Sequence, residues 1–244
     1  MSYKYSHIGK NFAKNYDTNI WNNFESRISN VENEILMSYL KRYITEKNAA
    51  ILDFACGTWR ITSFIASQYE NITGYDVSED MLAIARWKNP GIKFLKKDIL
   101  VENVDMKFDL ITSFRFFLNA EYPLKVSVLL ALKEYLLADG VLIFNIHMNS
   151  WSLAFFLTRC KHLLGLNSIR QNGMSYFDTK AMLRKCGYLL IESRWYSFLL
   201  WNPLLKFLPF SFLRSIDLFL SKIPFLKFFS KDIIYVCKKL NDAT

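Results

Sequence analysis

The sequence has few glycines, prolines and cysteines. It contains only 8 Gly and 5 Pro in 244 residues, and 52% of its residues are hydrophobic, which excludes a collagen-like, low-complexity or disordered protein. Its four cysteines lie far apart, without a Cys-x-x-Cys pair or a Cys/His cluster. We therefore expect neither a metal site nor a disulfide framework.

Long hydrophobic runs are also missing. No uninterrupted apolar run has the roughly 18 residues that a transmembrane helix needs. The opening residues MSYKYSHIGKNF lack the apolar core of a secretory signal, so we expect a cytoplasmic protein.

Acidic residues become scarce in the last part of the chain. Residues 1–150 carry 17 Lys and Arg against 17 Asp and Glu, whereas residues 151–244 carry 14 against 5. The net charge of +9 therefore lies entirely in the last part. This asymmetry predicts an anionic partner there, which is nucleic acid, a phospholipid surface or a phosphorylated substrate.

Short apolar segments alternate with helical patterns, which predicts an α/β fold with a doubly wound, mostly parallel, seven-stranded sheet. The expected strands are 51–54, 71–75, 91–95, 108–114, 140–147, 188–196 and 233–238. The expected helices are 20–47, 60–69, one capped by Ser78, 122–137, and one over 178–186 capped by Asp178 or Thr179. We expect a single domain, 1–244, with a helical lead-in (1–47), a ligand-binding core (48–147) and two apolar, basic insertions (148–176 and 197–231).

Three strand ends of this sheet carry residues suited to a nucleoside. The first strand runs into the turn Asp53-Phe54-Ala55-Cys56-Gly57-Thr58-Trp59-Arg60, whose small residues let a ligand approach the backbone. Asp76, about 20 residues on, is placed to accept hydrogen bonds from two ribose hydroxyls, and Asp98 from an exocyclic amino group. The turn has no Gly-x-Gly-x-x-Gly pattern, which disfavours a nicotinamide-binding domain.

These segments resemble the class I S-adenosylmethionine-dependent methyltransferases. ILDFACGTWRIT, GYDVSEDMLAIAR and FLKKDI resemble the first three motifs, and FDLITSF and LLADGVLIFNIH resemble the fourth and fifth strands, over roughly residues 48–147. The resemblance implies a Rossmann-like methyltransferase fold that binds S-adenosyl-L-methionine. Its implied cofactor contacts are Asp53 and the backbone of Ala55, Cys56 and Gly57 at the methionine part, Asp76 at the ribose, Asp98 and Ile99 at the adenine, and further Trp59, Val77, Met81 and Ser113. Trp59 stands where the family usually has glycine, and it forms either a wall of the site or an obstruction.

Candidate residues for the methyl acceptor follow the fourth and fifth strands. His147 is a candidate general base, or else a structural histidine at a strand end. Arg115 is a candidate to bind a carboxylate or phosphate, or else a surface arginine, and Asn119 lies beside it. The sequence has neither an Asn/Asp-Pro-Pro-Tyr/Phe signature nor a Pro-Cys pair, which makes nucleic acid an unlikely acceptor.

The insertion at 197–231 contains an amphipathic pattern. Its expected helix, 211–223, groups its apolar residues on an arc of about 120°: Phe212, Leu213, Ile216, Phe219, Leu220 and Ile223. Its polar residues fall outside this arc: Arg214, Ser215, Asp217, Ser221 and Lys222. This pattern favours a helix in a membrane interface, and the alternative is a lid over the site or a homodimer seam.

Three functions remain open from the sequence. The first is methyl transfer to a hydroxyl or carboxyl of an amphipathic, sugar-like or lipid-linked acceptor, with the protein peripheral on the cytoplasmic face of the inner membrane. The second is a soluble small-molecule methyltransferase with a helical lid or dimer seam. The third is a non-catalytic adaptor on the same fold.

Overall fold

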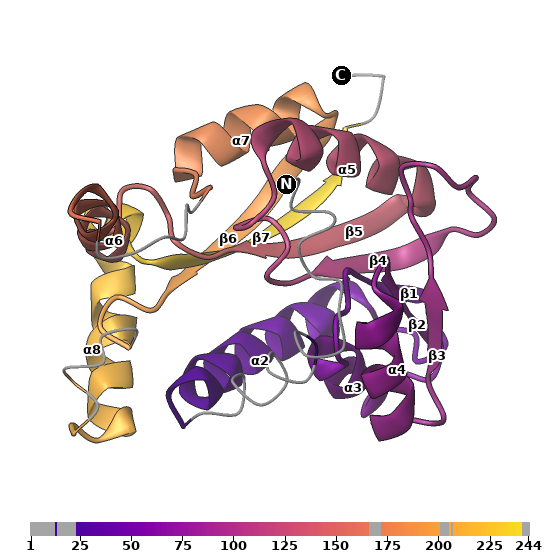
Figure 1. The fold of residues 1–244 in the computed structure, drawn as a ribbon, viewed down its shortest axis with the longest axis horizontal. Helices are drawn as coiled ribbons and strands as arrows, with labels where there is room; N and C mark the ends of the chain where they lie inside the picture. Colours follow the sequence, from indigo (N-terminus) through magenta and orange to yellow (C-terminus); the bar gives the residue numbers. More distant parts are fainter. Residues whose placement is uncertain (1–12, 14–22, 166–171, 201–204, 206, 241–244) are drawn as a thin grey trace.

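The fold is a seven-stranded sheet with helices on both faces (Figure 1). The computed structural model describes residues 13, 23–165, 172–200, 205 and 207–240. The strand order is β3-β2-β1-β4-β5-β7-β6, in which β7 is antiparallel to β5 and β6 and the other pairs are parallel. The predicted fold class is thus confirmed. The strands are β1 (Ile51–Phe54), β2 (Ile72–Asp76), β3 (Lys93–Lys96), β4 (Phe108–Ser113), β5 (Leu136–Ile146), β6 (Tyr188–Tyr196) and β7 (Asp232–Lys239).

The helices form one layer on each side of the sheet, and a further group lies at one end of the molecule. In Figure 1, α2 (Asn23–Tyr43), α3 (Arg60–Ala66) and α4 (Glu79–Lys88) lie on one side of the sheet, and α5 (Tyr122–Tyr135) and α7 (Tyr176–Lys185) lie on the other. The end of the molecule opposite α4 carries α6 (Leu153–Leu163) and α8 (Phe210–Lys222), and the short 3-10 helix η3 (Leu226–Phe229) follows α8. Both layers bury apolar side chains against the sheet, so the carboxyl ends of the strands are left to form a site.

Local hydrogen bonds decide where two helices begin. The Ser78 hydroxyl accepts from the Met81 backbone N–H at 3.4 Å, which confirms the predicted cap of α4. The predicted start of α7 at Asp178 or Thr179 is wrong, because Ser175 is the cap and its hydroxyl accepts from the Asp178 N–H at 3.1 Å. The sequence pattern misled because Asp178 is a residue type that often caps helices, but here it lies three residues after the cap. Its carboxylate accepts from the Ser175 hydroxyl, so the two side chains form a capping pair.

The orientation of α8 differs from its predicted amphipathic arc. Asp217, expected on the polar face, is buried, and its carboxylate accepts from the backbone N–H groups of residues 198–200. Leu213 is buried beside it, whereas Phe212 and Phe219 are exposed. The physical reason is that three backbone donors of the preceding loop need an acceptor, and this requirement rotates part of the apolar arc outward.

Candidate active site

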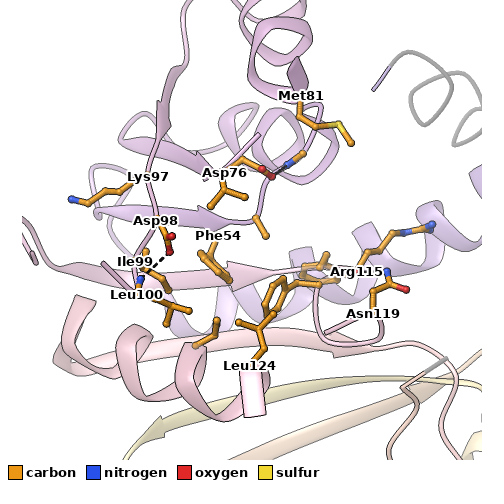
Figure 2. Close-up of a pocket in the computed structure, with 16 residues that line it drawn as sticks. Phe54, Asp76, Met81, Lys97, Asp98, Ile99, Leu100, Arg115, Asn119 and Leu124 are labelled. Carbon is orange, nitrogen blue, oxygen red and sulfur yellow. Dashed lines mark hydrogen bonds between the residues drawn. The ribbon is translucent and has the colours of Figure 1, made fainter. Parts of the chain in front are cut away.

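A cavity opens at the carboxyl ends of β1, β2, β3 and β4 (Figure 2). Asp98, Ile99 and Leu100 lie toward one end of it, and Arg115 and Asn119 lie at the other. The cavity brings together nine of the predicted site residues: Ala55, Gly57, Asp76, Val77, Met81, Asp98, Ile99, Arg115 and Asn119. It also has lining residues that the sequence did not identify: Phe54, Lys97, Leu100, Phe114, Phe116, Leu124 and Val128.

The turn after β1 is held in shape by Asp76. Ala55 and Gly57 have left-handed backbones, with φ of 56° and 59°, so the chain curls around the cavity without a side chain at Gly57. Asp76 accepts from the Gly57 N–H and from the Ser78 N–H, both at 2.9 Å. Burial raises the pKa of the Asp76 carboxyl. Asp76 therefore joins the ends of β1 and β2 at the cavity.

Asp53 lies behind the turn, in a smaller cavity that it shares with Cys56 and Arg60. Its carboxylate accepts from the Thr62 hydroxyl at 2.6 Å and from the Thr112 hydroxyl at 3.0 Å. Burial raises the pKa of Asp53 to about 6. These bonds tie β1 to α3 and β4, so the structure gives Asp53 a role in fixing the turn.

The other end of the cavity combines one carboxylate with apolar walls. Asp98 accepts from the Leu100 N–H at 3.1 Å, and its side chain points toward Phe54 and Ile99 (Figure 2). Leu124 and Val128 of α5 complete the wall. An apolar slot with a hydrogen-bond acceptor at its edge suits a flat heterocycle that carries an amino group.

Two of the predicted cofactor residues, Trp59 and Ser113, lie outside both cavities. Trp59 packs on a cluster formed by Cys56, Leu82, Ala85 and Phe94, with the Lys88 ammonium 5.0 Å from its ring centroid. It has φ of 126°. It is therefore neither a wall nor an obstruction of the main cavity, because its ring is directed to α4. Ser113 is buried in β4, and its hydroxyl has no hydrogen-bond partner among the described residues.

A buried polar cluster centred on Glu32 adjoins the cavity at Arg115. The Glu32 carboxylate of α2 is fully buried and accepts from Arg60 at 2.8 Å, from Asn145 at 3.1 Å and from the Tyr196 hydroxyl at 3.0 Å. The Arg115 guanidinium lies 3.9 Å from the same carboxylate. Burial acts to raise the pKa of Glu32, but the charges of Arg60, Arg115 and His147 lower it to about 2. Glu32 is therefore an anion.

His147 lies in this cluster and lines neither cavity. Its Nδ1 is 3.0 Å from Asp232 of β7, and its Nε2 is 3.0 Å from the Asn145 amide nitrogen and 3.4 Å from Glu32. Burial acts to raise the pKa of Asp232, but the charges of Lys231 and His147 lower it below its ordinary value. Because Asp232 is ionised, we assign the proton to Nδ1, which leaves Nε2 as the basic nitrogen.

The sequence did not identify Glu32, Asn145, Tyr196 or Asp232. Asn145 had a signal, because it lies two residues before His147 and therefore on the same face of β5. The Asn145 amide oxygen accepts from the Arg115 N–H at 2.8 Å and so links His147 to the cavity. Glu32 and Asp232 had no such signal, since only the folded sheet brings them within reach of residue 147.

Comparison with known proteins shows which domain and which fold this chain resembles. Residues 51–140 match the family model described as a methyltransferase domain. Magnesium protoporphyrin IX methyltransferase of Synechocystis, solved with bound S-adenosylhomocysteine, has the same fold, with a TM-score of 0.63, 14% identity, and coverage of 88% of this chain and 84% of that one. An S-adenosylmethionine-dependent methyltransferase of Clostridium acetobutylicum is similar, with a TM-score of 0.57, 16% identity, and coverage of 85% and 90%. Residues 51–140 thus match a methyltransferase domain, and the chain as a whole has the fold of S-adenosylmethionine-dependent methyltransferases.

Sequence relatives also have methyltransferase names. A methyltransferase-named protein of Geobacillus is 34% identical over 116 residues, which cover 44% of this chain and 46% of the relative. A ubiquinone biosynthesis O-methyltransferase of Hydrogenovibrio crunogenus is 25% identical over 187 residues, 71% of this chain and 75% of the relative. The chain spans 30% of a methyltransferase-named protein of Invertebrate iridescent virus 6 and 46% of the Geobacillus protein, so the matches to these two cover less than half of each.

The cavity fits S-adenosylmethionine, the cofactor of this family. Carboxylates stand at the ends of β2 and after β3, and an apolar slot lies between β1 and α5. A side chain at Gly57 would project into open space, with no atom within 4 Å of its Cβ. In this cavity Asp76 would hold the ribose, Asp98, Ile99 and Phe54 would hold the adenine, and the turn at Ala55 and Gly57 would hold the methionine part.

Proposed function

We propose that this chain methylates a hydroxyl or carboxyl oxygen of an amphipathic acceptor, a sugar or lipid-like molecule, at the cytoplasmic face of a membrane. The observation that carries the proposal is the buried Asp232–His147 pair, which Asn145 links to Arg115 of the cofactor cavity. The Hydrogenovibrio relative, whose name places it in ubiquinone biosynthesis as an O-methyltransferase, supports an oxygen acceptor.

His147 acts as the general base for a hydroxyl acceptor in this proposal. Bound S-adenosylmethionine supplies a sulfonium methyl group, which the acceptor oxygen takes as the carbon–sulfur bond breaks and S-adenosylhomocysteine remains. The hydroxyl proton passes to His147 Nε2, and the Asn145 amide, which lies 3.0 Å from this nitrogen, gives way to the incoming hydroxyl. The resulting imidazolium is stabilised because it lies between two carboxylates, Asp232 at 3.0 Å and Glu32 at 3.4 Å.

Arg115 and Asn119 bind and orient the acceptor. Both line the cavity at the end away from Asp98 (Figure 2). Arg115 has φ of 67°, and its backbone N–H is held by Asn145. A guanidinium in a fixed position suits a carboxylate or phosphate of the acceptor. Such positioning and the exclusion of water are the main contributions that a protein makes to methyl transfer.

Exposed apolar side chains at the α6–α8 end support the membrane part. Lysines and Arg159 lie among them, and the described residues include no helix long and apolar enough to cross a membrane. Aromatic residues beside cations suit the interface of an anionic bilayer. The exposed apolar residues are Trp151, Leu153, Phe156, Leu157, Leu163 and Leu164 around α6, and Phe212, Leu218, Phe219, Phe225 and Phe229 around α8.

The test is methyl transfer from labelled S-adenosylmethionine to lipid-linked sugars and quinone precursors. For a hydroxyl acceptor, we expect His147→Gln to lower kcat by about 100-fold or more, as loss of a general base does, while the Kd for S-adenosylhomocysteine stays within about twofold, because His147 lies outside the cofactor cavity. His162→Gln on α6 is the matched control and retains full activity. An unchanged kcat in His147→Gln would contradict the assignment of His147 as the general base. Binding of S-adenosylhomocysteine without methyl transfer to any acceptor would favour the adaptor function.

A further inference from the structure

A second cavity lies between α2, β6 and α8, which we call the α2–α8 cavity. It encloses about 330 Å³, the lower end of the range of small-molecule sites, about 300–1,000 Å³. It shares no lining residue with the cofactor cavity. The α2–α8 cavity is therefore a separate site from the cofactor cavity.

Two hydroxyl groups of this cavity are buried without a hydrogen-bond partner. Tyr39 of α2 is 2% exposed and Ser197 is 0% exposed, and neither hydroxyl has a partner among the described residues. Both residues line the cavity. Ser197 also has a left-handed backbone, with φ of 65°, a conformation that is unfavourable for serine. Buried polar groups are nearly always paired, so two such hydroxyls in one cavity point to an acceptor supplied by a ligand.

The charged side chains around the cavity leave one arginine for that ligand. Glu192 pairs with Arg42 at 2.7 Å, and Glu34 pairs with Arg214. The Asp217 carboxylate is occupied by the N–H groups of residues 198–200. Arg194 of β6 has no ion pair with any residue in the described part of the chain. Burial and the charge of Glu192 raise the pKa of Tyr39, and the charge of Arg194, which lines the same cavity, partly opposes this.

Another part of the cavity wall is apolar. It is formed by Val31 and Ile35 of α2, Leu200 and the exposed Leu218 of α8. We propose that the α2–α8 cavity binds an oxyanion carried on an alkyl chain, with the Tyr39 and Ser197 hydroxyls and the Arg194 guanidinium as donors to the oxyanion. This class includes single-chain phosphates and fatty acids. The proposal rests on the geometry of this cavity and does not depend on the methyl acceptor.

The α2–α8 cavity is connected to the active site through the side chain of Tyr196. Tyr196 lines the cavity and donates its hydroxyl to Glu32 at 3.0 Å. Glu32 in turn binds Arg60 and lies near His147. A ligand in the α2–α8 cavity therefore contacts the residue that connects β6 to the buried polar cluster.

The test is calorimetric titration with dodecyl phosphate below its micelle concentration, and with inorganic phosphate, in the presence of saturating S-adenosylhomocysteine. We expect micromolar binding of dodecyl phosphate to the wild-type chain. Tyr39→Phe and Arg194→Gln each weaken it at least about tenfold, whereas the control Arg159→Gln on α6 stays within about twofold. Inorganic phosphate binds at least about 100-fold more weakly, because it lacks the alkyl chain.

Folding is checked by the melting temperature. Tyr39→Phe removes a buried hydroxyl that has no partner, so its melting temperature without ligand is equal to or above that of the wild type. No binding of dodecyl phosphate, equal affinity in Tyr39→Phe, or equal affinity for inorganic phosphate would overturn the proposal. These outcomes leave the methyl-transfer proposal untouched, because vesicles and methyl acceptors are absent from the titration.

Discussion

At the scale of single residues, the site depends on one carboxylate from the lead-in helix. Glu32 is shared by the arginine that follows the first turn, the arginine at the cofactor cavity, and the asparagine and tyrosine beside His147. A buried anion is tolerated only when its partners satisfy it. The helix α2 is thereby tied to three strand ends through a single side chain.

Removing this charge should destabilise the fold. We expect Glu32→Gln to lower the free energy of unfolding at pH 7 by about 3–5 kcal/mol, because it leaves two arginines near a neutral amide. Urea denaturation measures this. Glu34→Gln on the same helix, whose partner Arg214 is also near the surface, is the control and should change stability by less than about 1 kcal/mol.

The stability difference between the wild type and Glu32→Gln depends on pH. The pKa of Glu32 is lowered from 4.5 to about 2, so its stabilisation is complete above pH 4.5 and is lost as the pH falls toward 2. The stability difference between wild type and Glu32→Gln should therefore shrink when denaturation is repeated at pH 3.5. A difference that is unchanged at that pH would contradict an ionised Glu32.

Asp76 is the residue whose loss should weaken cofactor binding most directly. We expect Asp76→Ala to raise the Kd for S-adenosylhomocysteine about 10- to 100-fold, because hydrogen bonds to a charged group contribute about 1.5–3 kcal/mol and the Gly57 N–H loses its acceptor. Calorimetric titration measures this, with Asp139→Ala at an exposed position as the control. Equal affinity of both variants would remove Asp76 from the ribose site.

At the scale of elements, the sequence predicts the units that repeat a local pattern. The strands that contain Asp53 and Asp76, and the strand that precedes Asp98, follow from apolar runs that end at a turn. The Ser78 cap follows from the preference of helices for serine at their first position. The burial of Asp217 could not be predicted in this way, since its partners are backbone groups 17–19 residues away. Helical periodicity places apolar residues on one side but contains no information on which polar residue faces the body.

The Asp217 carboxylate attaches α8 to the backbone of residues 198–200, and this attachment can be tested. We expect Asp217→Ala to lower the free energy of unfolding by about 1–3 kcal/mol, because three N–H groups lose their acceptor. Hydrogen exchange should become faster at residues 198–200 and along α8, while cofactor affinity is unchanged, since Asp217 is not in that cavity. Ser215→Ala, on the exposed face of α8, is the control. Unchanged exchange at 198–200 would mean that other contacts hold the helix.

At the scale of the whole molecule, the two ends of the sheet differ in chemistry. The β3 end belongs to the charge-balanced first part of the chain and carries the cofactor motifs, whereas the α6–α8 end belongs to the basic part. Sequence motifs predicted seven of the 16 residues that line the cofactor cavity, because each motif is local. The His147 cluster could not be predicted in full, because Glu32 and Asp232 are 115 and 85 residues from His147 in the chain.

This asymmetry leads to a prediction about the α6–α8 end. Phe212 and Phe219 of α8 are 53% and 64% exposed, and Trp87 of α4, at the opposite end, is 79% exposed. We expect the wild-type chain to co-sediment with anionic vesicles at low salt and less so at high salt. The double variant Phe212→Ser/Phe219→Ser should bind at least about tenfold more weakly, because full burial of one Phe contributes about 1.5–3 kcal/mol. Trp87→Ser should bind as the wild type does.

The outcomes of that experiment separate the alternatives for this surface. Loss of vesicle binding in the Phe variant alone would place the membrane contact at α8, since both side chains are exposed and their loss leaves the core intact. Equal loss in Trp87→Ser would indicate adsorption through any exposed aromatic residue and would contradict an oriented interface. A wild-type chain that ignores vesicles and sediments as a dimer, which the Phe variant converts to a monomer, would instead identify α8 as a dimer seam. The exposed apolar surface of α8 would then drive dimerisation in place of membrane binding, because burying it against any apolar partner lowers the free energy.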